Sequence, residues 1–218
     1  MNITTTPIEK LTELGKHGTI QTFTKDEIII RTDQAPPGVF LIKEGYIKAY
    51  SITDAGDENL HIIYGPNMIF PIIWAITGKL RQVFYEAMDD VSVYRIDRDM
   101  FLTFISEDPV ASNALLHRVI DMFNVYADRV DNLEYTHSYS RIVYRLLKLA
   151  QQYGEQGASG TLIKAPVKHY DIANSTNCSR ETVSREMEKL EKKGLIMYQN
   201  HHILVVDIDM LEKELLRS

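Results

Sequence analysis

The chain has 218 residues, of which 44% are hydrophobic and 25% charged, and its formal net charge is −6. This length suits two modest domains, and no apolar run approaches the ~18 residues of a membrane-spanning helix. The single cysteine excludes an intrachain disulfide and an iron–sulfur cluster held by several cysteines of one chain. Because the N-terminus lacks a basic and then apolar signal segment, we expect a cytoplasmic protein without a membrane partner.

Residues 15–105 have the pattern of many short strands separated by turn signals such as Glu44-Gly45 and Asp89-Asp90. The expected strands are 20–23, 27–30, 39–43, 46–51, 60–64, 83–88 and 91–96. Short strands at this spacing predict a closed or sandwiched antiparallel β fold.

Aromatic residues gather in and after the apolar segment 67–76, at Phe70, Trp74 and Phe84. They could fill the core of the β fold or line a pocket for an apolar ligand. Haem would need an axial ligand, and a metalloenzyme barrel would need several His and carboxylate ligands together. His17 and His61 are widely spaced, so we predict no metal site and no cofactor.

A long helix should follow, with Ser106 or Asp108 as its cap and Pro109 in its first turn. Its apolar residues recur at alternating spacings of three and four, which is the pattern of helix pairing. They are Leu116, Val119, Phe123, Tyr126, Val130 and Leu133. We call this set the seam. It favours a parallel dimer over a helix buried within its own chain.

Two short helices joined by a tight turn are expected within residues 170–194, after a helix at 141–153 and a flexible loop at 156–160. Asn177 tolerates the left-handed conformation that the turn needs, and Ser179 is a good N-cap for the second helix. At 100° per residue, one face of that helix carries Arg180, Glu181, Ser184 and Arg185, and another carries Val183, Met187 and Leu190.

The polar face, which we call the reading face, has the chemistry of base recognition. Arg pairs bidentately with guanine and Glu accepts from cytosine N4, and the first two turns of a recognition helix contact base edges. Residues 161–195 contain seven basic and five acidic residues, whereas the chain as a whole has a net negative charge. Expected contacts with the DNA backbone are Lys168, Ser179, Thr182 and His201. His201 lies in an expected wing hairpin of strands 195–199 and 203–207. A helix capped by Asp209 should follow this hairpin.

Residues 178–185, CSRETVSR, resemble the recognition helix of the Crp/Fnr family of bacterial transcription regulators. Residues 38–50 resemble the sensory β-roll of cyclic-nucleotide-binding domains, and the resemblance extends over nearly the whole chain. Thr176 departs from it, because the family usually places a buried Leu there, so we expect looser local packing. The resemblance implies a β-roll domain at 1–107, a dimerisation helix and hinge at 108–137, and a winged helix-turn-helix at 138–218. In activating members, the loop matching 156–160 touches RNA polymerase.

The effector site departs further from the family. In nucleotide-binding members a Gly-Glu pair and a downstream Arg hold the ribose and cyclic phosphate. Arg81 stands at the Arg position, but residues 69–71 replace the pair, and Tyr126 with Ala127 replaces a Thr-Ser pair. We therefore expect no binding of cyclic AMP or cyclic GMP. The effector is unknown, and its expected pocket is Phe70, Trp74, Arg81, Phe84 and Tyr126.

These features predict an α+β protein with an N-terminal antiparallel β-roll of the jelly-roll or double-stranded β-helix kind, a long dimerisation helix and a C-terminal winged helix-turn-helix. The predicted function is a homodimeric, sequence-specific regulator of transcription that binds inverted half-sites containing TGA in double-stranded DNA and is not an enzyme. The alternative is a ligand-binding or metal-dependent, cupin-like β-barrel whose C-terminal helices serve assembly only.

Overall fold

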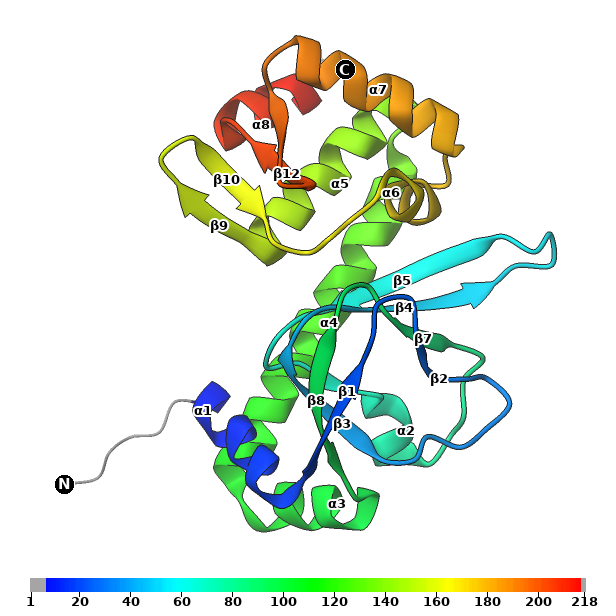
Figure 1. The fold of residues 1–218 in the computed structure, drawn as a ribbon, viewed down its shortest axis with the longest axis vertical. Helices are drawn as coiled ribbons and strands as arrows, with labels where there is room; N and C mark the ends of the chain where they lie inside the picture. The colour runs from blue at the N-terminus through cyan, green and yellow to red at the C-terminus, as the bar shows by residue number, and fades with distance from the viewer. Residues whose placement is uncertain (1–6, 217–218) are drawn as a thin grey trace. The chain divides into compact units, whose positions relative to one another are not determined.

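Figure 1 shows the computed structural model, which describes residues 7–216. The chain forms two compact units: the first is built from residues up to 51 and from 62–124, and the second from 52–61 and from 125 onward. The long helix α4 (Pro109–Glu134) contributes to both. Within the described residues, no helix combines the length and the apolar character needed to cross a membrane.

The N-terminal strands form two antiparallel four-stranded sheets, ordered β1-β8-β3-β6 and β2-β7-β4-β5. Their bounds are β1 Thr19–Phe23, β2 Ile28–Ile30, β3 Val39–Glu44, β4 Ile47–Ile52, β5 Glu58–Tyr64, β6 Ile69–Phe70, β7 Phe84–Ala87 and β8 Val91–Ile96. The seven expected strands are confirmed, and β6 is an addition. The fold class is therefore the predicted one.

Four short helices of this part were not predicted: α1 Pro7–Thr12, the 3₁₀ helix η1 Glu13–His17, α2 Ile72–Thr77 and α3 Arg98–Glu107. A short apolar run such as that of α2 does not distinguish a helix from a strand. Asp97 is a favourable N-cap residue and marks the start of α3 in the sequence. Its side chain accepts hydrogen bonds from the N–H groups of Asp99 and Met100.

One apolar core of the first unit joins helices to the β3–β8 sheet. Its buried members include Leu14, Leu41, Ile96 and Phe101, together with Leu115 from the first half of α4. The Asp108 carboxylate caps α4, accepting from Val110 N at 2.8 Å and Ala111 N at 3.3 Å. Asp108, rather than Ser106, is therefore the cap.

The second unit carries the helices α5 Ser138–Tyr153, α6 His169–Thr176, α7 Arg180–Lys192 and α8 Ile208–Leu216. Its antiparallel sheet has the order β11-β12-β10-β9. The strands are β9 Gly154–Gly157, β10 Gly160–Ile163, β11 Ile196–Gln199 and β12 His202–Val205. The predicted winged helix-turn-helix is thus present, with β11 and β12 as the wing.

Three local predictions for this unit need correction. The flexible loop expected at 156–160 is mostly the β9–β10 hairpin, in which Gly160, at φ 132°, lies against the carbonyl oxygen of Val205. Asp207, not Asp209, caps α8, because its carboxylate accepts from Met210 N at 3.0 Å. Thr176 is fully buried and its hydroxyl donates to the Ile172 carbonyl at 2.8 Å, so the packing there is closed, not loose.

Candidate nucleic-acid interface

The turn between α6 and α7 has the backbone that the sequence predicts. Asn177 adopts φ 51° and ψ 45°, the left-handed conformation, and ends α6. Ser179 then caps α7 by accepting a hydrogen bond from Thr182 N at 3.2 Å. At the other end of α6, the buried Asp171 carboxylate accepts from Lys168 N at 2.8 Å. Both short helices therefore have fixed ends.

Helix α7 is seated by one fully buried apolar face, in which the side chains of Val183, Met187 and Leu190 are 0% exposed. On the reading face, Arg180, Glu181 and Arg185 are exposed and Ser184 is half-buried. Hydrogen bonds from its own backbone N–H and from Ser179 hold the pKa of Glu181 below its usual range. The helix thus presents two cations and one carboxylate outward on a rigid support.

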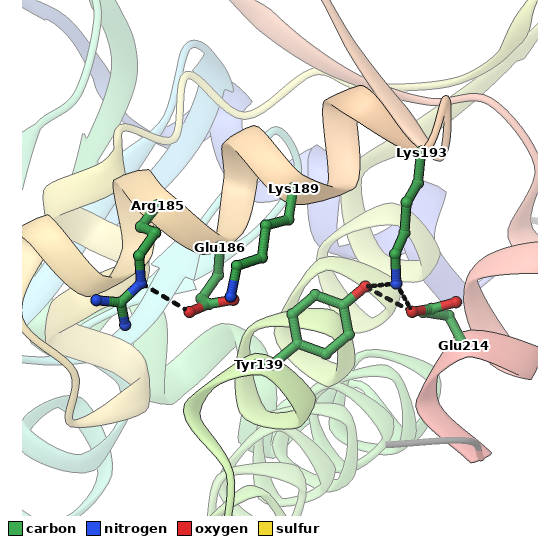
Figure 2. Close-up of polar contacts among 6 residues, drawn as sticks. All are labelled: Tyr139, Arg185, Glu186, Lys189, Lys193 and Glu214. Carbon is green, nitrogen blue, oxygen red and sulfur yellow. Dashed lines mark hydrogen bonds and ion pairs between the residues drawn. The ribbon is translucent and has the colours of Figure 1, made fainter.

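A buried carboxylate beside the reading face orients Arg185, as Figure 2 shows. Glu186 is 4% exposed and accepts from Arg185 Nε at 3.1 Å and from Lys189 Nζ at 2.7 Å. Burial raises the pKa of Glu186, but the hydrogen bonds from Lys189 and Arg185 outweigh that effect and lower it overall. The terminal nitrogens of Arg185, which are not used by this contact, remain available for a planar acceptor pair.

A second polar cluster in Figure 2 ties the C-terminal end of α7 to its neighbours. Tyr139 of α5 donates to the Glu214 carboxylate of α8 at 2.7 Å. Lys193, which follows α7, donates to Tyr139 Oη at 3.1 Å and forms an ion pair with Glu214. Burial and the hydrogen bond with Glu214 raise the pKa of Tyr139. These contacts fix the axis of α7 at the end opposite its reading face.

The residues expected to contact the DNA backbone lie on three different segments. Lys168 is exposed just before α6, and Ser179 and Thr182 lie in the first turn of α7. His201 is exposed at the tip of the wing, where Asn200 and His201 have φ angles of 49° and 67°. Two successive positive φ angles are those of a type I′ hairpin turn.

Four of the residues expected to form an effector pocket belong to the first unit, where they have different surroundings. Phe70 is fully buried and stacks on Phe40 and Tyr85, each with ring centroids 5.1 Å apart. Phe84 instead stacks on Tyr50, at 5.4 Å. Trp74 and Arg81 do line one small hollow of about 30 Å³, next to β2 and β7. Tyr126 belongs to the part of α4 in the second unit.

Sequence reasoning missed two residues of the candidate interface, Glu186 and His169. Glu186 follows Arg185 directly, and at 100° per residue it lies next to Leu190 at the edge of the buried face, so its burial had a signal in the helical pattern. His169 begins α6 and contacts Ser184 of α7 and Tyr198 of the wing, 15 and 29 residues away. No local motif marks such contacts. Among residues 7–216, no group of three or more His, Cys, Asp or Glu side chains could hold a metal ion.

Two family models match the chain, one in its C-terminal region and one in its N-terminal region. The Crp-like helix-turn-helix domain matches residues 140–214, and the cyclic nucleotide-binding domain matches residues 20–108. The first match contains α6, α7 and the wing, and the second contains the two sheets of the β-roll.

Curated relatives cover most of the chain at low identity. The CRP-like cAMP-activated global transcriptional regulator of Mycobacterium tuberculosis is 25% identical over 182 residues, which are 83% of this chain and 81% of that protein. The global nitrogen regulator of Synechococcus elongatus is 23% identical over 188 residues, 85% of each chain.

Solved structures share the fold over almost the whole length. A CooA variant from Carboxydothermus hydrogenoformans aligns with a TM-score of 0.76 at 20% identity, covering 97% of this chain and 96% of that one. FixK2 from Bradyrhizobium japonicum aligns with a TM-score of 0.77 at 20% identity, covering 90% and 96%. The two domain matches and the curated relatives show that the chain belongs to the Crp/Fnr family of transcription regulators.

Proposed function

We propose that this regulator binds an inverted repeat in double-stranded DNA as a homodimer, and that each α7 enters a major groove. The observation that carries this proposal is the reading face: Arg180, Glu181 and Arg185 point outward from a helix whose opposite face is fully buried. These charged side chains are exposed to solvent, and base edges offer matching acceptors and donors.

The seam of α4 supports the dimer. Four of its residues, Leu116, Phe123, Val130 and Leu133, are large, apolar and more than half exposed, and Phe123 reaches 69%. Val119 and the neighbouring Ile120 are exposed as well. A stripe of this kind along one helix is an interaction surface, and its heptad spacing suits a parallel partner of the same sequence. Two protomers paired in this way would relate two α7 helices by twofold symmetry, as a palindromic site requires.

We infer further that cyclic AMP and cyclic GMP are not effectors of this β-roll. At the position where relatives that bind nucleotides have a Gly-Glu pair, the interior is occupied by the stacked rings of Phe70, Phe40 and Tyr85. A cyclic phosphate needs N–H donors and cations in the site, and the Arg81 side chain is exposed to solvent. The residues present therefore do not fit a cyclic nucleotide.

Other parts of the proposal follow from DNA binding. The protein would act in the cytoplasm, where bacterial DNA lies, and would have no catalytic role. If it activates transcription, the β9–β10 turn is the place where RNA polymerase would contact it.

The test is selection of bound duplexes from a random pool, followed by sequencing. We expect inverted half-sites with a TGA core, centred about one helical turn apart. Enrichment of no palindrome, or of one without TGA in both arms, would contradict the assignment of the reading face.

A further inference from the structure

His169 links the recognition helix to the wing through both of its ring nitrogens. Its Nδ1 lies 2.9 Å from Ser184 Oγ on α7, and its Nε2 lies 2.7 Å from Tyr198 Oη on β11. The three residues come from three different elements of the second unit. Ser184 is the member that also belongs to the reading face, between Arg180 and Glu181 around the helix.

The direction of these two hydrogen bonds depends on the tautomer of His169. A neutral imidazole has one donor nitrogen and one acceptor nitrogen. Burial, and then the charge of Arg180, lowers the pKa of His169, while burial raises the pKa of Tyr198 to about 12. His169 is therefore neutral near pH 7, and the Tyr198 phenol keeps its proton.

The acidity of the two hydroxyl groups favours the tautomer protonated on Nδ1. The contacts of 2.9 Å at Nδ1 and 2.7 Å at Nε2 are within hydrogen-bond range for either tautomer. A phenol is a stronger donor than an aliphatic alcohol. The favoured arrangement therefore has Tyr198 O–H donating to Nε2 and Nδ1–H donating to Ser184 Oγ.

We propose that His169, oriented by Tyr198, is a positioning residue that makes Ser184 a hydrogen-bond donor toward DNA and so biases the base that it contacts. A free serine hydroxyl pairs with either donors or acceptors on a base edge. Here the Nδ1–H of His169 occupies a lone pair of Ser184 Oγ, which leaves the hydroxyl proton free to point outward. A hydroxyl that already accepts one bond also donates more strongly.

The predicted consequence is a preference for acceptor edges at one position of each half-site. Thymine presents the O4 acceptor where cytosine presents the N4 amino donor, so the ratio of thymine to cytosine reports the polarity of Ser184. This inference rests on the proposed function, since it requires that the reading face contact bases.

The experiment compares base preferences selected from random duplexes by the parent protein, by four single variants and by one double variant. Ser184→Ala identifies the position that Ser184 contacts. At that position, His169→Phe should reduce the preference for acceptor bases by roughly threefold to tenfold, the size of one hydrogen bond. Tyr198→Phe keeps the aromatic ring and removes only the hydroxyl that sets the tautomer, so it should produce a smaller loss at the same position. His202→Phe is the matched control, because that histidine contacts the Ile163 carbonyl and not the reading face.

The double variant His169→Phe with Ser184→Ala separates polarity from general damage. It should show the same preference as Ser184→Ala alone at the contacted position. Unchanged preference in both His169→Phe and Tyr198→Phe would overturn the proposal, and so would a further change in the double variant. If His169→Phe does not fold, the Tyr198→Phe result decides alone. Failure of the parent to select any palindrome would instead reject the proposed function.

Discussion

The side chains that suggest a function are exposed on the helices α4 and α7 but buried in the interior of the β-roll. On the helices, Phe123 and Arg185 are exposed, and each is of a residue type suited to binding another molecule. In the β-roll, the position that holds a ligand in relatives that bind nucleotides is occupied by Phe70, which is 0% exposed and stacked between two aromatic rings. We infer that the exposed sets serve association, whereas the buried set serves stability.

The largest effect is expected for Phe123→Glu, which places two carboxylates in the paired seam. Each buried charge would cost several kcal/mol, even after relaxation, so the dimer should dissociate and binding to a palindrome should be lost. Sedimentation at micromolar concentration measures the change. Asn124→Glu adds the same charge at the neighbouring position, outside the seam, and should remain dimeric. A parent chain that sediments as a monomer would contradict the assignment of the seam.

Truncation of Phe70 tests the buried side of the comparison. Phe70→Ala should lower the free energy of unfolding by about 3–5 kcal/mol, because it removes a fully buried ring and leaves a cavity. Denaturant titration at fixed protein concentration measures the loss. Phe84→Ala is the matched control, since its ring is partly exposed and should cost less. The folded variant should keep the base preference of the parent, and a changed preference would show that the two regions are not separate in function.

Arg185→Ala tests the exposed side at the reading face. It should weaken binding by about 1–3 kcal/mol per half-site and relax the preference at one guanine, with little change in unfolding. Lys192→Ala, at the far end of α7, is the control. Affinities for the selected site and for single-base variants at constant salt provide the measurement. Equal loss on every sequence would place Arg185 on the phosphates instead of the bases.

Lys168→Ala should have a smaller and different effect. If the lysine neutralises a phosphate, its loss weakens all sequences alike and reduces the slope of log affinity against log salt by about one per protomer. Lys164→Ala is the comparison, because Lys164 is exposed and paired with Glu155 at 3.2 Å. A slope that is the same in the parent and in Lys168→Ala would show that Lys168 does not contact a phosphate.

The smallest effect is predicted for cyclic nucleotides. Titration calorimetry with cyclic AMP and with cyclic GMP should give no saturable heat below about millimolar, an affinity worth only ~4 kcal/mol. A micromolar dissociation constant for either would mean that the aromatic rings around Phe70 rearrange to admit a ligand, and the contrast between the two regions would then no longer hold.

The sequence by itself determined the features that depend on local periodicity and backbone chemistry. Short segments separated by turn signals placed the strands of the β-roll, and Asn177 and Ser179 placed the turn and start of α7. The 100° rotation per residue separated the buried and exposed faces of α7. These features depend on neighbours within a few residues, so a single sequence is enough to predict them.

The tertiary structure alone decided which residues serve the interior and which hold the interface in place. Phe70 and Trp74 read alike in sequence, yet one is enclosed by stacked rings and the other lines a hollow. The same holds for His169, whose contacts to Ser184 and Tyr198 arise only when α6, α7 and the wing pack together. Burial and hydrogen bonding between distant segments depend on the whole fold, and for this reason the local pattern could not predict them.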